Sequence, residues 1–146
     1  MYQIAPFVSE LHDVLIDALT NFPINMDAVL PLLDGRLAIE LRRLVSLEDL
    51  RESGAFFTGN KLGRIAVSKK FASTINETSV FIDPACGGGD LLLSCTPYLP
   101  IFPDLTETLN HWQLNLVGVD LHSEFVEIAK LRLILKAITL GAKTNT

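Results

Sequence analysis

Apolar residues recur at helical spacing through the first third of the chain. A first helix is expected to end at residues 21–23, and its apolar face comprises Ile4, Phe7, Val8, Leu11, Leu15, Ala18 and Leu19. A second helical stretch covers residues 26–45, and Pro31 is expected to break or restart it because proline lacks a backbone donor. We interpret residues 1–53 as a helical N-terminal region.

The pattern changes after residue 53. A helix is predicted from residue 60, with Asn60 as its cap and Leu62, Ile65, Ala66 and Phe71 as its anchors. The run "SVFID" then indicates a short parallel strand covered on both faces, and "LNLVGVD" repeats this pattern of an apolar strand that ends in an acid. Helices are expected to begin at "DLLLSC", after a cap at Asp104 with Glu107, and after a cap at Ser123.

The order of these elements predicts an α/β fold. Helix, strand, glycine turn, helix, strand and helix follow one another from residue 54, which is the opening of a doubly wound, Rossmann-like domain. Two strands leave the usual sheet of about five to six strands incomplete. The last helix, residues 123–140, is apolar around much of its circumference. We therefore expect open strand edges and apolar surface, and with them self-association or a partner subunit.

Composition narrows the possible classes of protein further. The chain of 146 residues is 49% hydrophobic, yet no apolar stretch approaches the roughly 20 residues of a membrane helix. Its first residues lack the features of a secretion signal, so we predict a cytoplasmic protein without a membrane segment. The two cysteines and three histidines do not stand at metal-ligand spacing. A net charge of -5 gives no global attraction to a phosphate backbone.

The glycine turn in "DPACGGGD", residues 83–90, is the strongest candidate for a site. A strand, a glycine turn and a helix start form a backbone cradle for a ligand. No Lys-Ser or Lys-Thr pair follows Gly89, which argues against a triphosphate loop, and Leu92 stands where a dinucleotide fingerprint has its third glycine. Asp83 and Asp90 bracket the turn with negative charge, which suits a cationic ligand such as S-adenosylmethionine.

Asp120 is the second candidate ligand-binding acid. It ends the second strand, where an acid in such folds binds a pair of ribose hydroxyls. Its separation from the turn exceeds the usual ~20 residues. The proline-rich loop and short helix of residues 97–112 account for the excess.

Residues 54–135 resemble the adenine-N6 DNA methyltransferases of restriction-modification systems, in particular type I methylation subunits. The matching stretches are "GAFFT", "DPACGGGDLLL" and "GVDLHSEFVEIAKLRL". The resemblance implies that Asp120 binds the ribose and that Leu121 lies beside the adenine of S-adenosylmethionine. It also implies a set of residues around the methionine moiety: Gly54, Phe56, Phe57, Thr58, Asp83, Pro84, Ala85, Cys86, Gly87 and Gly89.

Two positions and one missing motif depart from the family pattern. Gly59 replaces a proline after the leading motif, and Gly88 replaces the serine of the glycine signature. The catalytic motif, Asp or Asn followed by Pro-Pro and an aromatic residue, is missing, since no Pro-Pro pair occurs in the sequence. We therefore assign no catalytic residue and expect the strand that carries this motif, with any target-recognition domain, to follow Thr146.

Two hypotheses of different classes remain open. In the first, residues 54–146 are the cofactor-binding part of a DNA adenine-N6 methyltransferase, which acts on DNA only with downstream regions or other subunits and is inactive alone. In the second, the chain is a non-catalytic remnant or an interaction module that pairs with another subunit. A small-molecule or protein methyltransferase is a third reading, which the leading "GAFFT" motif disfavours.

Overall fold

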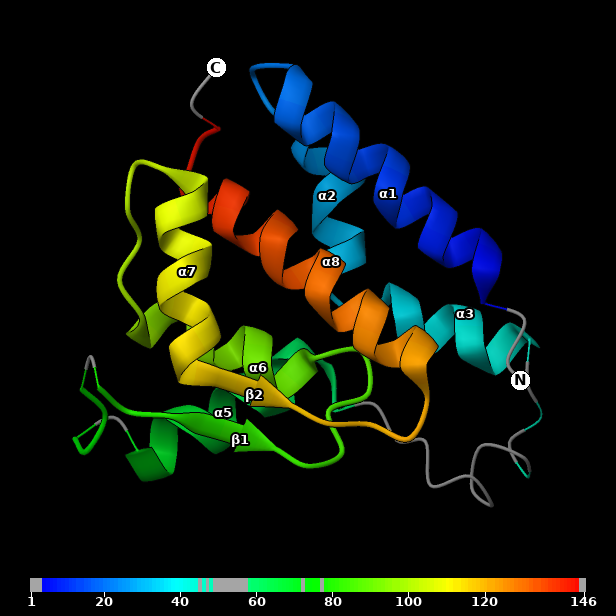
Figure 1. The fold of residues 1–146 in the computed structure, drawn as a ribbon. Coiled ribbons are helices and arrows are strands. Elements are labelled where there is room, and N and C mark those ends of the chain that lie inside the picture. Colours follow the sequence, from blue (N-terminus) through cyan, green and yellow to red (C-terminus); the bar gives the residue numbers. More distant parts are fainter. Residues whose placement is uncertain are drawn as a thin grey trace.

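The fold is mixed α/β and mostly helical. A computed structural model describes residues 4–44, 46, 48, 58–71, 73–76 and 78–144 (Figure 1). Its elements in chain order are α1 (Ala5–Thr20), α2 (Met26–Leu33), α3 (Arg36–Leu44), α5 (Gly59–Phe71), β1 (Phe81–Asp83), α6 (Asp90–Cys95), a 3-10 turn (Thr96–Tyr98), α7 (Leu105–Asn115), β2 (Leu116–Gly118) and α8 (Ser123–Thr139). No helix of the described residues is long and apolar enough to cross a membrane.

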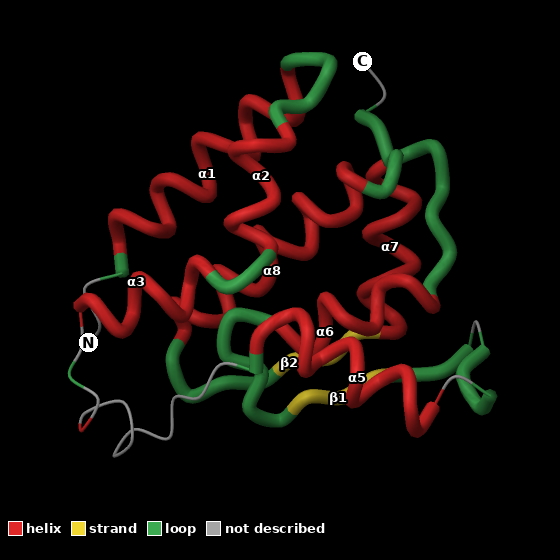
Figure 2. Tube along the Cα trace, turned by 180° about the vertical axis from the view of Figure 1, so that it is seen from behind, coloured by secondary structure: helices red, strands yellow, loops and turns green. Residues whose placement is uncertain are grey.

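Helix α8 runs through the middle of the molecule. Figures 1 and 2 show α1 and α2 on one side of it and the two strands on the other. It contacts α1, α2, α6 and α7, and its buried residues are Phe125, Ile128, Ala129, Leu131, Arg132, Leu135, Ala137 and Ile138. Neighbouring helices thus cover α8 on several sides, whereas Val126, Leu133 and Ile134 line an open apolar pocket beside β2.

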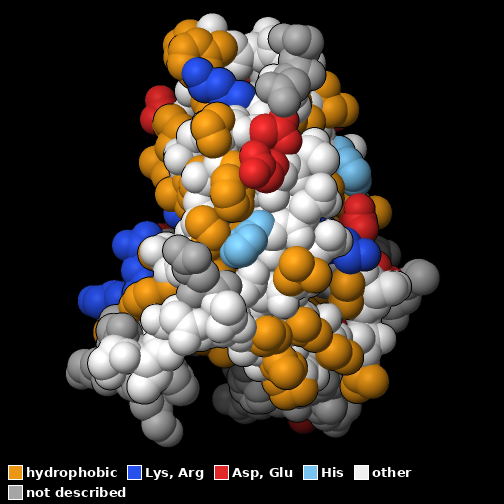
Figure 3. Space-filling model, turned by 60° about the vertical axis from the view of Figure 1, so that its left-hand side comes forward, with side chains coloured by type: hydrophobic (Ala, Val, Ile, Leu, Met, Phe, Trp, Pro, Cys, Tyr) orange, Lys and Arg blue, Asp and Glu red, His pale blue; other side chains and the backbone are white. Residues whose placement is uncertain are grey.

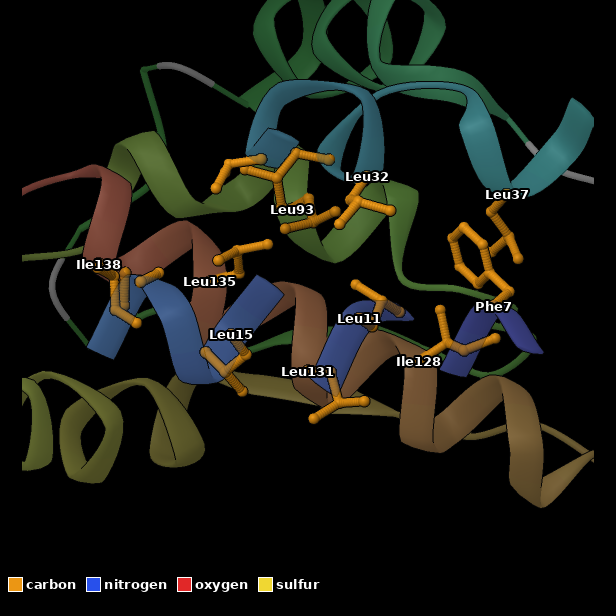
Figure 4. Close-up of a cluster of buried hydrophobic side chains, with 14 of the residues drawn as sticks. Phe7, Leu11, Leu15, Leu32, Leu37, Leu93, Ile128, Leu131, Leu135 and Ile138 are labelled. Atoms are coloured by element: carbon orange, nitrogen blue, oxygen red, sulfur yellow. The ribbon is translucent and has the colours of Figure 1, made fainter. Parts of the chain in front are cut away.

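One apolar core joins the N-terminal helices to the rest of the chain. Phe7, Leu11 and Leu15 of α1 lie in the same buried cluster as Leu93 of α6 and Leu135 of α8 (Figure 4). Leu32 and Leu37, from α2 and α3, belong to it as well. The division of the sequence at residue 53 is thus crossed by a continuous core, and the helical region is packed directly on the elements that carry the candidate site.

The two strands form a parallel pair. Phe81 lies opposite Leu116 and Asp83 opposite Gly118, and the connection runs through α6 and α7. The pairing continues beyond the strands, because the Val119 N–H donates to the Asp83 carbonyl (2.9 Å) and the Cys86 N–H donates to the Val119 carbonyl (2.8 Å). The predicted parallel arrangement is confirmed, and it brings the residues that follow both strands to one edge of the sheet.

The sheet is covered on one face only. Gly118 lies against Leu92 of α6, whereas Ile82, whose side chain points to the other face, is 68% exposed. Its partner Val117 is exposed as well, and so are Val80 and Val119, which share this face by the alternation of strand residues. Coverage on both faces, expected from the apolar run, is therefore wrong for the described residues.

The boundaries of the helices agree with the sequence at the start of α7 and differ at α2, α5 and α8. Asp104 caps α7, since its carboxylate accepts a hydrogen bond from the Glu107 N–H (2.7 Å). Pro31, however, lies inside α2. The helix ends only at Leu33, and the turn that follows contains Gly35 with a φ of 74°. Ser123 is the first residue of α8 rather than its cap, a shift of one position.

Helix α5 turns a different face inward than the sequence predicts. The expected anchors Leu62, Ile65 and Ala66 are exposed, whereas Gly63 and Val67 are buried. The reason is the close approach of α6, because a Cβ atom on Gly63 would lie 2.3 Å from the Ser94 hydroxyl oxygen. The helix starts at Gly59, one residue before the expected cap at Asn60.

Candidate functional site at the glycine turn

Residues 84–89 form the turn between β1 and α6. Gly87 and Gly89 have φ values of 49° and 85°, the left-handed region that glycine adopts without strain. The backbone of Cys86, Gly87, Gly88 and Gly89 is buried, whereas Pro84 and Ala85 are exposed. The turn therefore has an inner side fixed by the fold and an outer side that is open to solvent.

Asp120 joins the turn to the second strand. Its Oδ2 accepts a hydrogen bond from the Gly87 N–H (2.9 Å), and its Oδ1 accepts one from the His122 N–H (2.9 Å). Asp83, at the end of β1, accepts one from the Ala85 N–H (3.2 Å). The structure thus brings together the acids that the sequence placed after the two strands. A carboxylate has about four acceptor positions, so Asp120 retains capacity for a pair of hydroxyl donors.

The other two glycines are required by packing. A Cβ atom on Gly88 would lie 2.0 Å from Cδ2 of Leu37, and one on Gly89 would lie 3.0 Å from Cβ of Ala129. Real Cβ atoms do not approach other carbon atoms as closely as the first of these distances. Gly88, which stands where the resembling family has serine, is therefore matched to a leucine from the N-terminal helices.

A buried arginine underlies the turn. Arg132 of α8 has no exposed surface, and its Nη1 donates to the Gly88 carbonyl. Its Nε donates to the Leu32 carbonyl (2.8 Å) and its Nη2 to the Leu33 carbonyl (3.1 Å). The motifs do not single out this residue. The sequence does contain one sign of its role, because a single arginine interrupts the apolar run "LRLIL". A charged residue that is buried with its helix needs several hydrogen-bond partners.

Asp90 does not serve as a second negative charge for a ligand. Its Oδ1 pairs with Nη2 of Arg132 (2.9 Å), and its Oδ2 accepts a hydrogen bond from the Gly59 N–H (2.9 Å). The sequence-based view that Asp83 and Asp90 both bracket the turn is wrong, because the guanidinium neutralises Asp90. The acids that face the turn without an arginine partner among the described residues are Asp83 and Asp120.

The cysteine of the turn is not a nucleophile at neutral pH. Burial raises the pKa of the Cys86 thiol, and the negative charges of Asp120 and Asp83 raise it further. Burial also raises the pKa of Cys95 to about 11. Both cysteines are free, and the raised pKa values favour the thiol over the thiolate near pH 7.

The remaining predicted residues fall into three groups. Thr58 is half-buried beside Gly59, whose N–H bonds to Asp90 at the start of α6, so it lies near the turn. Leu121 is 96% exposed and is in contact with little of the protein. Gly54, Phe56 and Phe57 lie outside the described residues. No group of three metal-binding side chains occurs in the part of the chain that the structure describes.

Comparison with known families gives one match over most of the chain. A family model described as N-6 DNA Methylase matches residues 43–145. The match includes α5, both strands, the glycine turn and α8, and every candidate site residue. No solved structure matches the chain.

Proposed function

The chain belongs to the N-6 DNA methylase family, and from this premise we propose that it supplies the S-adenosylmethionine-binding part of a DNA adenine-N6 methyltransferase of a restriction-modification system. Residues 54–146 then correspond to the opening of the Rossmann-like cofactor domain. When bound, S-adenosylmethionine would supply a sulfonium methyl group for transfer to an amine, with the neutral thioether as leaving group and a proton lost from the amine. The raised pKa of Cys86 is compatible with such a transfer, since no protein nucleophile is needed.

The observation that carries the proposal is the contact between Asp120 and the glycine turn. The carboxylate binds the Gly87 N–H and the His122 N–H and retains acceptor positions for two hydroxyl groups. Asp83 adds a second acid at the same edge of the sheet, which suits the positive charges of the cofactor. Arg132, whose guanidinium contacts the turn, is occupied by carbonyls and by Asp90, so it does not offer a pyrophosphate a partner.

Calorimetry of S-adenosylmethionine binding tests the role of Asp120. The Asp120→Asn variant keeps the size of the side chain but loses its charge and one pair of acceptor positions. We expect binding weaker by about 1–3 kcal/mol, the cost of a lost hydrogen bond in a partly buried site. Asp13→Asn, on the outer side of α1, removes the same charge away from the turn and serves as control. Equal affinities of Asp120→Asn and the wild type would contradict the assignment, as would tighter binding of NAD.

We also propose that the chain alone does not methylate DNA. Alignment of two reactants supplies up to roughly 7–11 kcal/mol of a rate enhancement. The aromatic Pro-Pro motif that holds a flipped adenine does not occur in these 146 residues. Incubation with labelled S-adenosylmethionine and DNA of mixed sequence should leave the DNA unlabelled. Labelled N6-methyladenine above a control without protein would show that a catalytic pocket assembles from these residues.

The alternative function is that of an interaction module without catalysis. The observation in its favour is the exposed apolar face of the sheet at Val80, Ile82, Val117 and Val119. A module of this kind would associate with itself or with another subunit and would not need S-adenosylmethionine. If the wild type does not bind S-adenosylmethionine but forms a stable complex with itself or with another subunit, this function is favoured over the first.

A further inference from the structure

Arg132 connects four parts of the molecule through one guanidinium group. It stands on α8 and donates hydrogen bonds to the Gly88 carbonyl in the turn and to the Leu32 and Leu33 carbonyls of α2. It also pairs with Asp90 at the start of α6. We propose that Arg132 is a positioning residue for the cofactor-binding turn, and that through it α2 forms part of the support of the cofactor site, together with Leu37 of α3 at Gly88. This proposal rests on the proposed function for its ligand.

The turn needs such a support because it is built from glycines. Gly87 and Gly89 adopt positive φ values on either side of Gly88, and glycine has few steric barriers to other conformations. Each peptide group is planar, so the Gly88 carbonyl and the Gly89 N–H move together. The guanidinium fixes this peptide from below, while the Gly89 N–H donates to the Cys86 carbonyl (2.8 Å). Without Arg132 the buried Gly88 carbonyl loses its partner, and the peptide is then held from its N–H side, by the bond to the Cys86 carbonyl.

The contacts with α2 extend this support to the N-terminal helices. Leu32 and Leu33 are the last residues of α2, where helix carbonyls have no partner within the helix and a cation is favourable. Leu37 of α3 fills the space above Gly88 that a Cβ atom would occupy. The turn is thus held between α8 and the helical region. Because coupling between two binding events is reciprocal, a bound cofactor should also stabilise the docking of α2 and α3.

The competing explanation is that Arg132 only stabilises the fold. A buried ion pair can hold α8 to α6 without any effect on the turn, and its loss would then lower stability alone. In that case the folded fraction of a variant would bind S-adenosylmethionine as tightly as the wild type. The proposal requires instead that the affinity of the folded protein falls and that the backbone of residues 87–89 changes.

The experiment uses the full chain with Arg132→Lys, and with Arg43→Met as control. Lysine keeps the charge beside Asp90 but is a single point donor, so it does not reach three carbonyls as the planar fork does. Arg43 is exposed and pairs with Glu40 (3.1 Å) within α3, so its loss leaves the contacts between helices intact. Calorimetry on protein corrected for its folded fraction gives the affinity. Amide hydrogen exchange in the cofactor-free protein independently measures how well the backbone of residues 87–89 is held in place.

We expect Arg132→Lys to bind S-adenosylmethionine at least about tenfold more weakly, since several buried carbonyls lose a charged donor. Exchange at Gly87 and Gly89 should accelerate while α1 stays protected. Arg43→Met should bind within about twofold of the wild type, as exposed ion pairs contribute little. Wild-type affinity and wild-type exchange at residues 87–89 in a folded Arg132→Lys variant would overturn the proposal.

Two further results keep the test decisive. If Arg132→Lys does not fold, Leu37→Val loosens the contact with Gly88 without removing a hydrogen bond. It should weaken binding and accelerate the same amides, and wild-type behaviour of this variant would refute the proposal. If the wild type does not bind S-adenosylmethionine at all, the proposed function fails, and the exchange measurements still decide whether Arg132 positions the turn.

Discussion

Gly88 and Leu37 show how closely a single position of the turn is matched to its surroundings. A methyl group on Gly88 would overlap Cδ2 of Leu37 and approach Nη1 of Arg132 to 3.2 Å. Leu37 is itself 2% exposed and belongs to the core, so it has little room to move. The serine of the resembling family does not fit this turn without displacement of the leucine. Gly88 is therefore explained by the packing of the N-terminal helices and not only by the conformation of a turn.

This contact predicts the effect of Gly88→Ala. The added methyl group should lower the free energy of unfolding by about 1–3 kcal/mol, the usual cost of overpacking a well-filled core. Leu37→Ala removes the obstructing side chain. In the double variant the cost of Gly88→Ala should therefore be smaller than in the wild type. Denaturant unfolding of the four proteins measures this coupling, and strictly additive effects would show that the two residues do not meet.

Cys95 predicts a loss of stability at high pH. Burial raises its pKa from 9.0 to about 11 in the folded protein, so the folded state holds this proton more tightly than the unfolded chain. The resulting stability is fully present below pH 9.0 and is lost as the pH rises through about 11. Cys95→Ala should therefore show a shallower fall in unfolding free energy between pH 9 and pH 11. An equal slope in both proteins would exclude the thiol as the cause.

Secondary structure and the local site were predictable where a few neighbouring residues determine them. Asp104 caps its helix through a bond to Glu107, three residues along. At the end of α8, the N–H groups of Gly141 and Ala142 bond to the Ile138 and Ala137 carbonyls, the pattern of a glycine helix end. The acids after the two strands meet because parallel strands end at the same edge. The two helix ends depend on neighbouring residues, whereas the meeting of the acids follows from the general geometry of parallel strands, although Gly87 and Asp120 are 33 positions apart.

The features that sequence did not predict depend on partners far along the chain. Asp90 was expected to place a negative charge beside a cationic ligand. It pairs instead with Arg132, which is 42 positions away. The side chain of Leu62 was expected to be buried. Gly63 faces α6 instead, because only a residue without a side chain permits this close approach of the two helices. Apolar periodicity identifies a helix, but it does not tell which neighbour the helix meets.

The packing of α5 gives a prediction that separates its two faces. Val67 is buried against the rest of the protein, so Val67→Ala should lower the unfolding free energy by about 1–3 kcal/mol. Leu62 is 62% exposed, so Leu62→Ala should change it by less than about 0.5 kcal/mol. Thermal or denaturant unfolding of the two variants shows which face of α5 is packed against the protein. A larger effect of Leu62→Ala would restore the orientation that the sequence pattern predicts.

The molecule as a whole combines one closed core with one open sheet. The core joins α1, α2 and α3 to α6 and α8, so the N-terminal helices support the turn rather than standing apart from it. The sheet is different, because within the described residues each strand pairs only with the other. Hydrophobic side chains also gather in the lower part of the face shown in Figure 3. Apolar surface of this kind on a small protein indicates a contact with another chain or segment.

The open sheet predicts self-association of the isolated chain. Ile82 is 68% exposed and shares its face with Val117, beside strand edges whose backbone groups offer hydrogen bonds to a further strand. Ile82→Lys places a charge on this face without disturbing the core. We expect sedimentation at low micromolar concentration to show dimers or larger species for the wild type and a shift toward monomer for this variant. Ile39→Lys, at an equally exposed site on α3, should associate as the wild type does. A wild type that sediments as a single monomer, or an equal effect of both variants, would show that the open face of the sheet is not the contact.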